Sequence, residues 1–230
     1  MNDRTGGDLD TGAERQIDWK DVRFTFFLAG VFMLLKWTNF TRPEWHLNAT
    51  DALVSFLLTL GYIVARARRQ PEKLDEWGIS TPLTFPAVAV ALLLIGIGVG
   101  VLIVSTGIAF AGGPRFEPSY LPRMVDYIVG AFPQQFVMCS VGLVSLAKLR
   151  PFRNTWVLAL AVGLVFCLAH FLLPGKSLST MLLELATLFP AGFLAASYFL
   201  KFRNILPLTA MHAILYILLS NWTSWAMAHH

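Results

Sequence analysis

The stretch LTFPAVAVALLLIGIGVGVLIVSTGIAF, residues 83–110, decides the fold class. It contains no charged residue. It is also longer than the roughly 20 apolar residues that an α-helix needs to cross the hydrocarbon core of a bilayer. A run of this length and composition is typical of a membrane-spanning helix and not of a helix in a water-soluble core. The sequence therefore predicts that this segment crosses a membrane.

The composition of the whole chain agrees with a membrane protein. Of its 230 residues, 56% are hydrophobic and 14% are charged, whereas about 25% of an average soluble domain is charged. The mean hydropathy is +0.60. These values exclude a disordered chain and a disulfide scaffold. The net charge of +4 comes from basic residues that lie between apolar runs. This pattern fits the positive-inside rule and predicts no nucleic-acid partner.

Seven apolar segments predict an all-α polytopic membrane helical bundle of about seven transmembrane helices, and the length allows about six to eight. The predicted spans are residues 23–37, 51–65, 83–110, 124–147, 155–173, 177–200 and 205–227. If the N-terminus is cytoplasmic, 13 of the 18 Lys and Arg residues fall in inside segments. The positive-inside rule therefore favours that orientation. We expect a polar cytoplasmic tail at residues 1–20 and a single integral membrane domain at residues 21–230.

The connector at residues 67–82, ARRQPEKLDEWGISTP, is the longest predicted inside loop. Its basic start and Trp77 fit either a segment on the membrane surface or an ordinary solvated connector. Cys139 and Cys167 are the only cysteines, and both lie in apolar runs without the spacing of metal ligands. We interpret them as small core residues. The sequence predicts no metal and no other cofactor.

Polar side chains are costly inside a bilayer, so each one in a predicted span is a candidate functional residue. Those at depth occur in the last four predicted spans and are Asp126, Gln134, Gln135, His170, Glu184 and His212. We expect these four helices to pack around one cavity. The alternative for each residue alone is a hydrogen bond between helices. Asp126 is expected near the outer end of its span, in contact with water.

Each of the two histidines shares a helix face with an aromatic residue four positions away. Phe166 precedes His170, and Tyr216 follows His212. From the predicted helix starts, His170 lies about 15 residues into its span and His212 lies about seven residues into its own. Straight helices would therefore leave the two imidazoles about 12 Å apart in depth.

With these spacings, the region from about Gly130 to Asn221 resembles the CPBP family of intramembrane endopeptidases. This family includes CAAX prenyl proteases and bacteriocin-processing or self-immunity proteins. Its pattern is Glu-Glu-x-x-x-Arg, then Phe-x-x-x-His, then His-x-x-x-Asn or Asp, each on its own helix. Here the second motif is intact from Phe166 to His170, and the third begins at His212. The similarity also covers the segments at residues 76–79, 191–193 and 201–213. It implies a protease-like core at residues 123–226.

The sequence departs from the family pattern at positions that carry chemistry. Gln134 and Gln135 stand where the family has two glutamates, and Cys139 stands in place of the arginine. Tyr216 stands in place of the final Asn or Asp. In the family, the first glutamate is understood to activate water, and a Gln amide cannot accept a proton at neutral pH. The chain therefore resembles a divergent branch with Gln-Gln in place of Glu-Glu.

The candidate catalytic residues are His170, His212, Gln134, Gln135, Glu184 and Tyr216. By the resemblance, the two histidines would donate hydrogen bonds to the substrate carbonyl or its oxyanion, and the glutamine pair would position water or substrate. The tyrosine would replace the motif's Asn as a hydrogen-bond donor. The glutamate is the only carboxylate well inside the last four spans, so it is the candidate for a substitute base.

Three functions stay open at this point. The first is a CAAX-protease-like intramembrane endopeptidase that acts on membrane-associated or lipidated peptides. The second is a catalytically inactive pseudoprotease that binds a membrane peptide or partner protein through the same site. The third is a small-solute transporter, because polar residues on adjacent helices can line a substrate path. In each case the lipid bilayer surrounds the protein, and the resemblance implies a bacterial plasma membrane.

Overall fold

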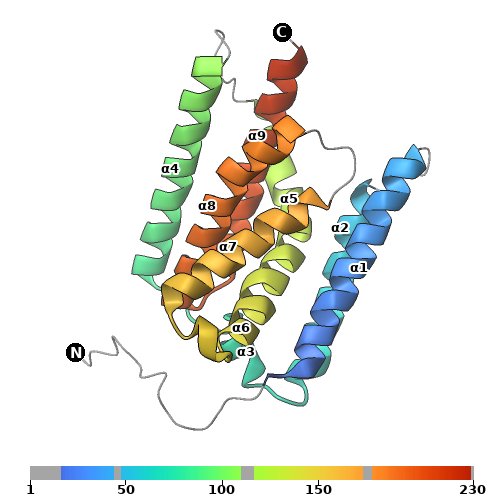
Figure 1. Cartoon of the computed structure of the whole chain (residues 1–230), viewed down its shortest axis with the longest axis vertical. Helices are drawn as coiled ribbons and strands as arrows, with labels where there is room; N and C mark the ends of the chain where they lie inside the picture. Colours follow the sequence, from blue (N-terminus) through green and yellow to red (C-terminus); the bar gives the residue numbers. More distant parts are fainter. Residues whose placement is uncertain (1–16, 44–47, 110–116, 173–177, 229–230) are drawn as a thin grey trace.

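The computed structural model describes residues 17–43, 48–109, 117–172 and 178–228, and every regular element in these ranges is a helix (Figure 1). The long helices are α1 (Trp19–Thr41), α2 (Asn48–Ala67), α4 (Phe85–Ala109), α5 (Tyr120–Gln135), α7 (Thr155–Phe171), α8 (Leu178–Phe202) and α9 (Leu206–Ala228). The short elements are α3 (Lys73–Glu76), the π-helix η2 (Phe136–Leu143), α6 (Val144–Leu146) and the 3-10 helix η3 (Arg150–Phe152).

The predicted membrane bundle is confirmed. Within the described ranges, five helical segments are long and apolar enough to cross a membrane: α1, α2, α4, the continuous α5–η2–α6 segment, and α8. Helices α7 and α9 contain shorter apolar stretches. Each of the seven predicted spans thus coincides with one helical segment. Of the expected polar tail, residues 1–16 lie outside the described residues, while Trp19 and Lys20 already belong to α1.

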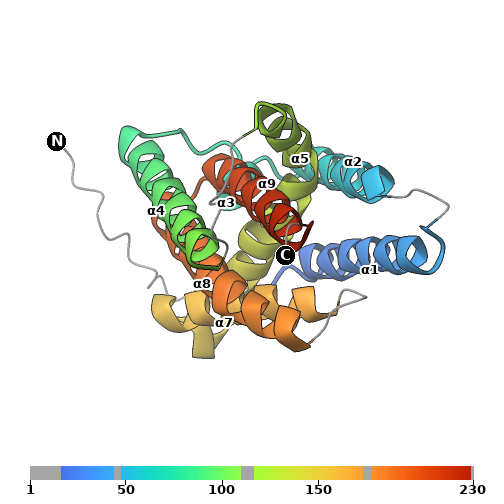
Figure 2. The same ribbon diagram turned by 90° about the horizontal axis from the view of Figure 1, so that it is seen from above.

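The helices pack around the continuous α5–η2–α6 segment, which contacts α1, α2, α7, α8 and α9. Viewed end-on, α9 lies between α4 and α5, while α1 and α2 form one edge of the bundle (Figure 2). Helices α7 and α8 cross closely, since a Cβ added to Gly192 of α8 would lie 3.0 Å from the Gly163 Cα of α7. Small residues let two helix backbones approach this closely in a membrane. From this crossing, α7 runs steeply inclined to α4 and α9 (Figure 1).

Polar caps and a proline define the helix ends that matter for the site. Asn154 accepts a hydrogen bond from the Trp156 amide at 2.9 Å and so begins α7. Near the end of α5, Pro133 has no amide hydrogen to donate. Three residues later the helix continues as the π-helix η2. Such segments are rare and occur frequently at functional sites.

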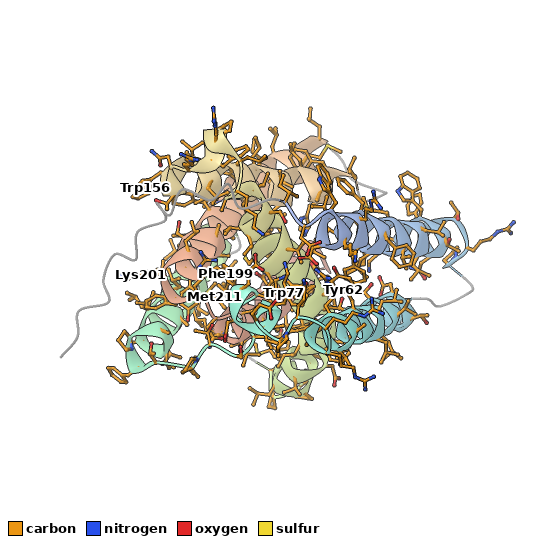
Figure 3. All side chains as sticks on the ribbon, turned by 90° about the horizontal axis from the view of Figure 1, so that it is seen from below. Tyr62, Trp77, Trp156, Phe199, Lys201 and Met211 are labelled. Carbon is orange, nitrogen blue, oxygen red and sulfur yellow. The ribbon has the colours of Figure 1, made fainter. Side chains whose placement is uncertain are left out.

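The connector between α2 and α4 is anchored to the bundle by three buried residues, Lys73, Trp77 and Gly78, while its other residues are exposed or partly exposed. Trp77 is fully buried. Its ring centre is 5.1 Å from that of Phe136 in η2 and 5.9 Å from that of Tyr62 in α2. Its carbonyl oxygen accepts a hydrogen bond from Ser140 Oγ at 2.6 Å. Trp77 and Tyr62 are seen toward the middle of this end of the bundle in Figure 3. Burial of this aromatic ring holds the connector against the bundle.

A cluster of ion pairs joins this connector to α1, α2 and the chain after α6. The pairs are Lys73–Asp21 (2.9 Å), Lys73–Glu76 (2.9 Å), Lys73–Asp18 (3.3 Å), Lys148–Glu76 (2.9 Å) and Arg66–Asp21 (3.2 Å). The Tyr62 hydroxyl also donates to Asp21. Because each buried charge has several partners, the cost of removing it from water is offset.

This cluster predicts a loss of stability in acid. Burial opposes ionisation of Glu76, but hydrogen bonds from Lys73 and Lys148 outweigh it and lower the pKa of Glu76 below its usual 4.5. A carboxylate whose pKa is lowered by folding stabilises the protein above its unfolded pKa, and that contribution is lost as the pH falls through the folded pKa. We expect Lys148→Met to lower the melting temperature at pH 7 and to reduce its further fall between pH 7 and about pH 3.

The measurement is thermal unfolding of the detergent-solubilised protein across this pH range. Lys20→Met, which removes an exposed charge on α1, is the matched control and should keep the wild-type pH profile. An unaltered profile in Lys148→Met would contradict the role of the cluster.

A second prediction concerns Gly78, where the connector turns back under α8. Its φ is +69°, and a Cβ there would lie 2.6 Å from the Arg203 carbonyl oxygen. The left-handed conformation alone costs an L-residue about 1–2 kcal/mol. We expect Gly78→Ala to lower the melting temperature by at least about 4 °C. In α2, Gly61 has open space for a Cβ, so Gly61→Ala should leave the melting temperature unchanged or raise it. Equal melting temperatures for the two variants would contradict this account.

Candidate active site

Two of the predicted site residues meet directly. Gln135 is the last residue of α5 and is almost fully buried, and His212 lies in the second turn of α9. The Gln135 Nε2 atom is 2.8 Å from His212 Nδ1. A hydrogen bond of this kind is expected where polar side chains face each other between membrane helices. It fixes the start of α9 against the junction of α5 and η2.

Cys139 determines which way the Gln135 amide points. The Cys139 Sγ atom lies 3.7 Å from Gln135 Oε1, one helical turn away. Because the thiol donates and the amide oxygen accepts, the amide NH₂ group faces His212. The amide donates to His212 Nδ1, which must therefore be unprotonated. In the neutral ring the proton is then on Nε2, so His212 presents an N–H donor on its far side.

His170 has the opposite arrangement. Its Nδ1 atom is 2.8 Å from the carbonyl oxygen of Phe166, one turn earlier on α7. A carbonyl oxygen can only accept a hydrogen bond, so Nδ1 must carry the proton. In the neutral ring Nε2 is then the unprotonated nitrogen, which can accept a proton. The two histidines thus offer different chemistry: His212 offers a donor and His170 offers an acceptor.

Phe166 brings the two histidines into one site. Its ring centre is 4.6 Å from that of His170 and 6.1 Å from that of His212. The 12 Å difference in depth that straight helices would give therefore does not separate them. Helix α7 is inclined to α9, and a tilted helix advances less along the bundle per residue (Figure 1).

The other amide, Gln134, points away from the Gln135–His212 contact. Its Nε2 atom donates to the Gly130 carbonyl oxygen at 3.2 Å, and the side chain also forms a hydrogen bond with Tyr127. The glutamine pair is thus divided between two environments. Gln135 joins the histidine of α9, while Gln134 joins an aromatic group on its own helix.

Tyr216 belongs to the site through a residue that the sequence analysis missed. Its ring stacks on that of Tyr127 from α5, with ring centres 4.1 Å apart and planes 8° apart. The ring centres of Tyr127 and Tyr216 lie 6.0 Å and 6.5 Å from that of His212. Tyr127 precedes Gln134 by seven positions, which is two helical turns on one face. That spacing was the signal that could have identified it.

A buried carboxylate outside the predicted set lies on the α2 side of the tyrosine pair. Asp51 forms an ion pair with Lys36 of α1 at 2.5 Å, and its charge acts on the Tyr127 hydroxyl. The next residue, Ala52, lies 3.5 Å from the position of a Cβ built on Gly130. The sequence analysis placed Asp51 at the edge of a predicted span, and its burial could not be read from hydropathy.

Of the two carboxylate side chains predicted within the last four spans, the structure describes one. Glu184 lies on α8, but its side chain is outside the described part of the structure. Asp126 lies on α5 with an exposed side chain. Within the described residues, no group of three His, Cys, Asp or Glu side chains could hold a metal ion.

The fold and the site define a polytopic helical membrane protein with a histidine and amide site between α5, α7 and α9. Residues 121–218 match the family model described as type II CAAX prenyl endopeptidase Rce1-like. The matched region runs from α5 into α9 and contains all six candidate catalytic residues. The match confirms the resemblance inferred from the motifs. No curated protein and no solved structure matches the chain.

The geometry predicts opposite tautomers for the two histidines. Nitrogen-15 NMR of histidine-labelled protein at pH 8 should show Nδ1–H at His170 and Nε2–H at His212. Gln135→Met removes the amide donor while keeping the length of the side chain, and it should release His212 into a mixture of tautomers. His170 should be unaffected by that substitution. The same tautomer at both histidines in the wild type would refute the assignment.

Proposed function

We propose that this protein is a CAAX-protease-like intramembrane endopeptidase that cleaves membrane-associated or lipidated peptides. The observation that carries the proposal is the pairing of a donor histidine with an acceptor histidine in one site. Peptide hydrolysis needs both, since a base must take a proton from water and a donor must stabilise the oxyanion. The match to the CAAX endopeptidase model supports the choice of reaction.

In this proposal His212 binds the carbonyl oxygen of the scissile peptide. Its Nε2–H group is directed by the Gln135 contact on the opposite side of the ring. Tyr216 lies four residues later on the same face of α9 and supplies a second donor through its hydroxyl. The Tyr127 ring stacked against Tyr216 holds that side chain in place. Such preorganised donors gain strength in a site from which water is largely excluded.

In this proposal His170 is the general base, the role that the family assigns to a glutamate. Its Nε2 atom removes a proton from water, and the water oxygen attacks the carbonyl carbon. The oxyanion that forms accepts hydrogen bonds from His212 and Tyr216. The His170 imidazolium then gives its proton to the leaving amine as the C–N bond breaks. The Phe166 carbonyl stabilises the imidazolium through its contact with Nδ1–H.

Gln134 and Gln135 act by position and not by proton transfer. Gln135 orients His212, and Gln134 supports the Tyr127–Tyr216 stack. Glu184 stays a competing candidate for the base, because it is a carboxylate on α8, the helix that crosses α7.

One observation favours a second function, that of an inactive binder of membrane peptides. Both ends of the Gln135 amide are engaged, the oxygen by Cys139 and the nitrogen by His212. A side chain held in this way cannot turn to direct a water molecule. The site would then keep its donors for a peptide carbonyl without the means to hydrolyse it.

The proposal places the N-terminus in the cytoplasm of a bacterial cell and the helices in its plasma membrane. The end of the bundle that includes α3 and α6 is rich in basic residues, among them Arg68, Arg69, Arg150, Arg153 and, in the last turn of α8, Lys201. The positive-inside rule assigns such an end to the cytoplasm.

The test uses the full-length protein in liposomes with a fluorescent peptide that carries a prenylated cysteine near its C-terminus. Cleavage is followed by mass spectrometry, and binding is followed by fluorescence anisotropy. We expect His170→Gln to lower the cleavage rate by at least about 100-fold while peptide affinity changes little. His212→Gln should lower the rate by a similar factor and also weaken binding. Asp126→Asn, an exposed change on α5, is the control and should match the wild type.

Three other results would change the assignment of the base or of the function. Loss of cleavage in Glu184→Gln with retention in His170→Gln would make the glutamate the base. Binding that depends on His212, without turnover in the wild type, would establish the inactive binder. A wild-type protein that neither binds nor cleaves prenylated peptides would overturn the proposed function.

A further inference from the structure

A hollow of about 290 Å³ lies between the start of α7 and the end of α8, away from the histidine site. Its lining residues are Thr155, Trp156, Ser197, Leu200 and Lys201. Its wall combines an ammonium group, two hydroxyl groups and apolar surface. That combination suits an amphiphile with an anionic head, and nothing in the proposed peptidase reaction uses it.

The position of the hollow is that of the membrane–water boundary. Helix α7 begins and helix α8 ends beside it, and the basic element η3 immediately precedes α7. Trp156 is 68% exposed, and its ring packs on Phe193 of α8 with the centres 5.8 Å apart. Tryptophan is enriched at the level of lipid headgroups because its ring is apolar and its N–H is polar. Figure 3 shows Trp156 and Lys201 at the periphery of this end of the bundle.

Lys201 is placed to bind an anion. Its Nζ atom lies 5.4 Å from the centre of the Phe202 ring, and its side chain is exposed. Among the side chains that the structure describes, none of the ion pairs includes Lys201. The lysines of the inner cluster differ in this respect, since Lys73 and Lys148 both pair with Glu76. Arg153, close to Thr155 along the chain, is also exposed.

We infer that this hollow binds an anionic phospholipid from the surrounding leaflet. The Lys201 ammonium pairs with the headgroup phosphate, and the Thr155 hydroxyl donates to a phosphate oxygen. The upper part of an acyl chain lies against Trp156 and Leu200. Basic pockets between membrane helices on the cytoplasmic side are known to bind such headgroups. This inference does not depend on the proposed function.

The bound lipid also has a structural consequence for the histidine site. It contacts α7 and α8 together, at the end of α7 opposite His170. These two helices meet closely at Gly163 and Gly192, where the Phe166 side chain of α7 lies against Gly192. A lipid held across their ends would oppose separation of the pair and so stabilise the inclination of α7.

The test is native mass spectrometry of the full-length detergent-solubilised protein titrated with phosphatidylglycerol or with phosphatidylcholine. We expect phosphatidylglycerol to bind more tightly, and Lys201→Gln to weaken its binding about fivefold, the effect of about one basic side chain near an anionic membrane surface. Lys20→Gln removes an exposed lysine at the start of α1, and it should leave binding unchanged. Thr155→Val keeps the size of the side chain and should weaken binding without loss of charge.

Three results would overturn the inference. Equal affinities for the two lipids would remove the role of charge. Equal losses in Lys201→Gln and Lys20→Gln would assign the effect to general surface charge and not to the hollow. Displacement of the lipid by inorganic phosphate at millimolar concentration would make a soluble anion the ligand. Because each variant is compared by lipid binding alone, the result is independent of peptide cleavage.

Discussion

The burial of Trp77 is the contact on which the rest of the site depends. Its ring packs against Phe136, and Ser140 binds its carbonyl oxygen, so both anchors lie in η2. Gln135 immediately precedes Phe136, and the position of its amide therefore follows from that of Trp77. The buried backbone groups of the connector must also form hydrogen bonds. Here the Gly78 carbonyl accepts from the Ile205 amide at 3.0 Å, which joins the connector to the start of α9 and thus to His212.

Helix α1 forms ion pairs near both of its ends and buries few apolar side chains. Only Asp21 and Leu28 of α1 are buried, whereas a packed helix normally buries a continuous apolar stripe. Asp21 binds Arg66 and Lys73, which fastens the start of α1 to α2 and α3. These partners lie 45 and 52 positions away in the sequence. The charges are visible in the sequence, but their pairing depends on where the connector folds.

Hydropathy was sufficient to predict the seven helices, because the bilayer imposes a length and a composition on each span. The cost of polar groups in lipid was sufficient to select Gln135, His170 and His212. Neither argument could give the inclination of α7, which follows from the close approach of Gly163 to α8. Nor could they predict the burial of Trp77. The hydropathy of one span carries no information on its contacts with another span. Tyr127 was missed for the same reason, because it belongs to the site through its contact with Tyr216 of α9.

The residues at the family's glutamate and arginine positions are all neutral in this chain, so the substitutions balance one another in charge. A pair of glutamates beside an arginine is a set of opposite charges in a dry interior, and removing only one sign would leave a charge unpaired at high cost. In this chain both glutamines are neutral, and Cys139 is neutral where the arginine would be. The thiol donates to the Gln135 oxygen, so the amide is satisfied without a cation.

With no carboxylate at Gln135, the contact favours a neutral His212 and fixes its tautomer. The proposed base lies on another helix, α7, where His170 holds its Nδ1–H against Phe166. In the proposed function, the unprotonated Nε2 of His170 has the role that the family assigns to a glutamate.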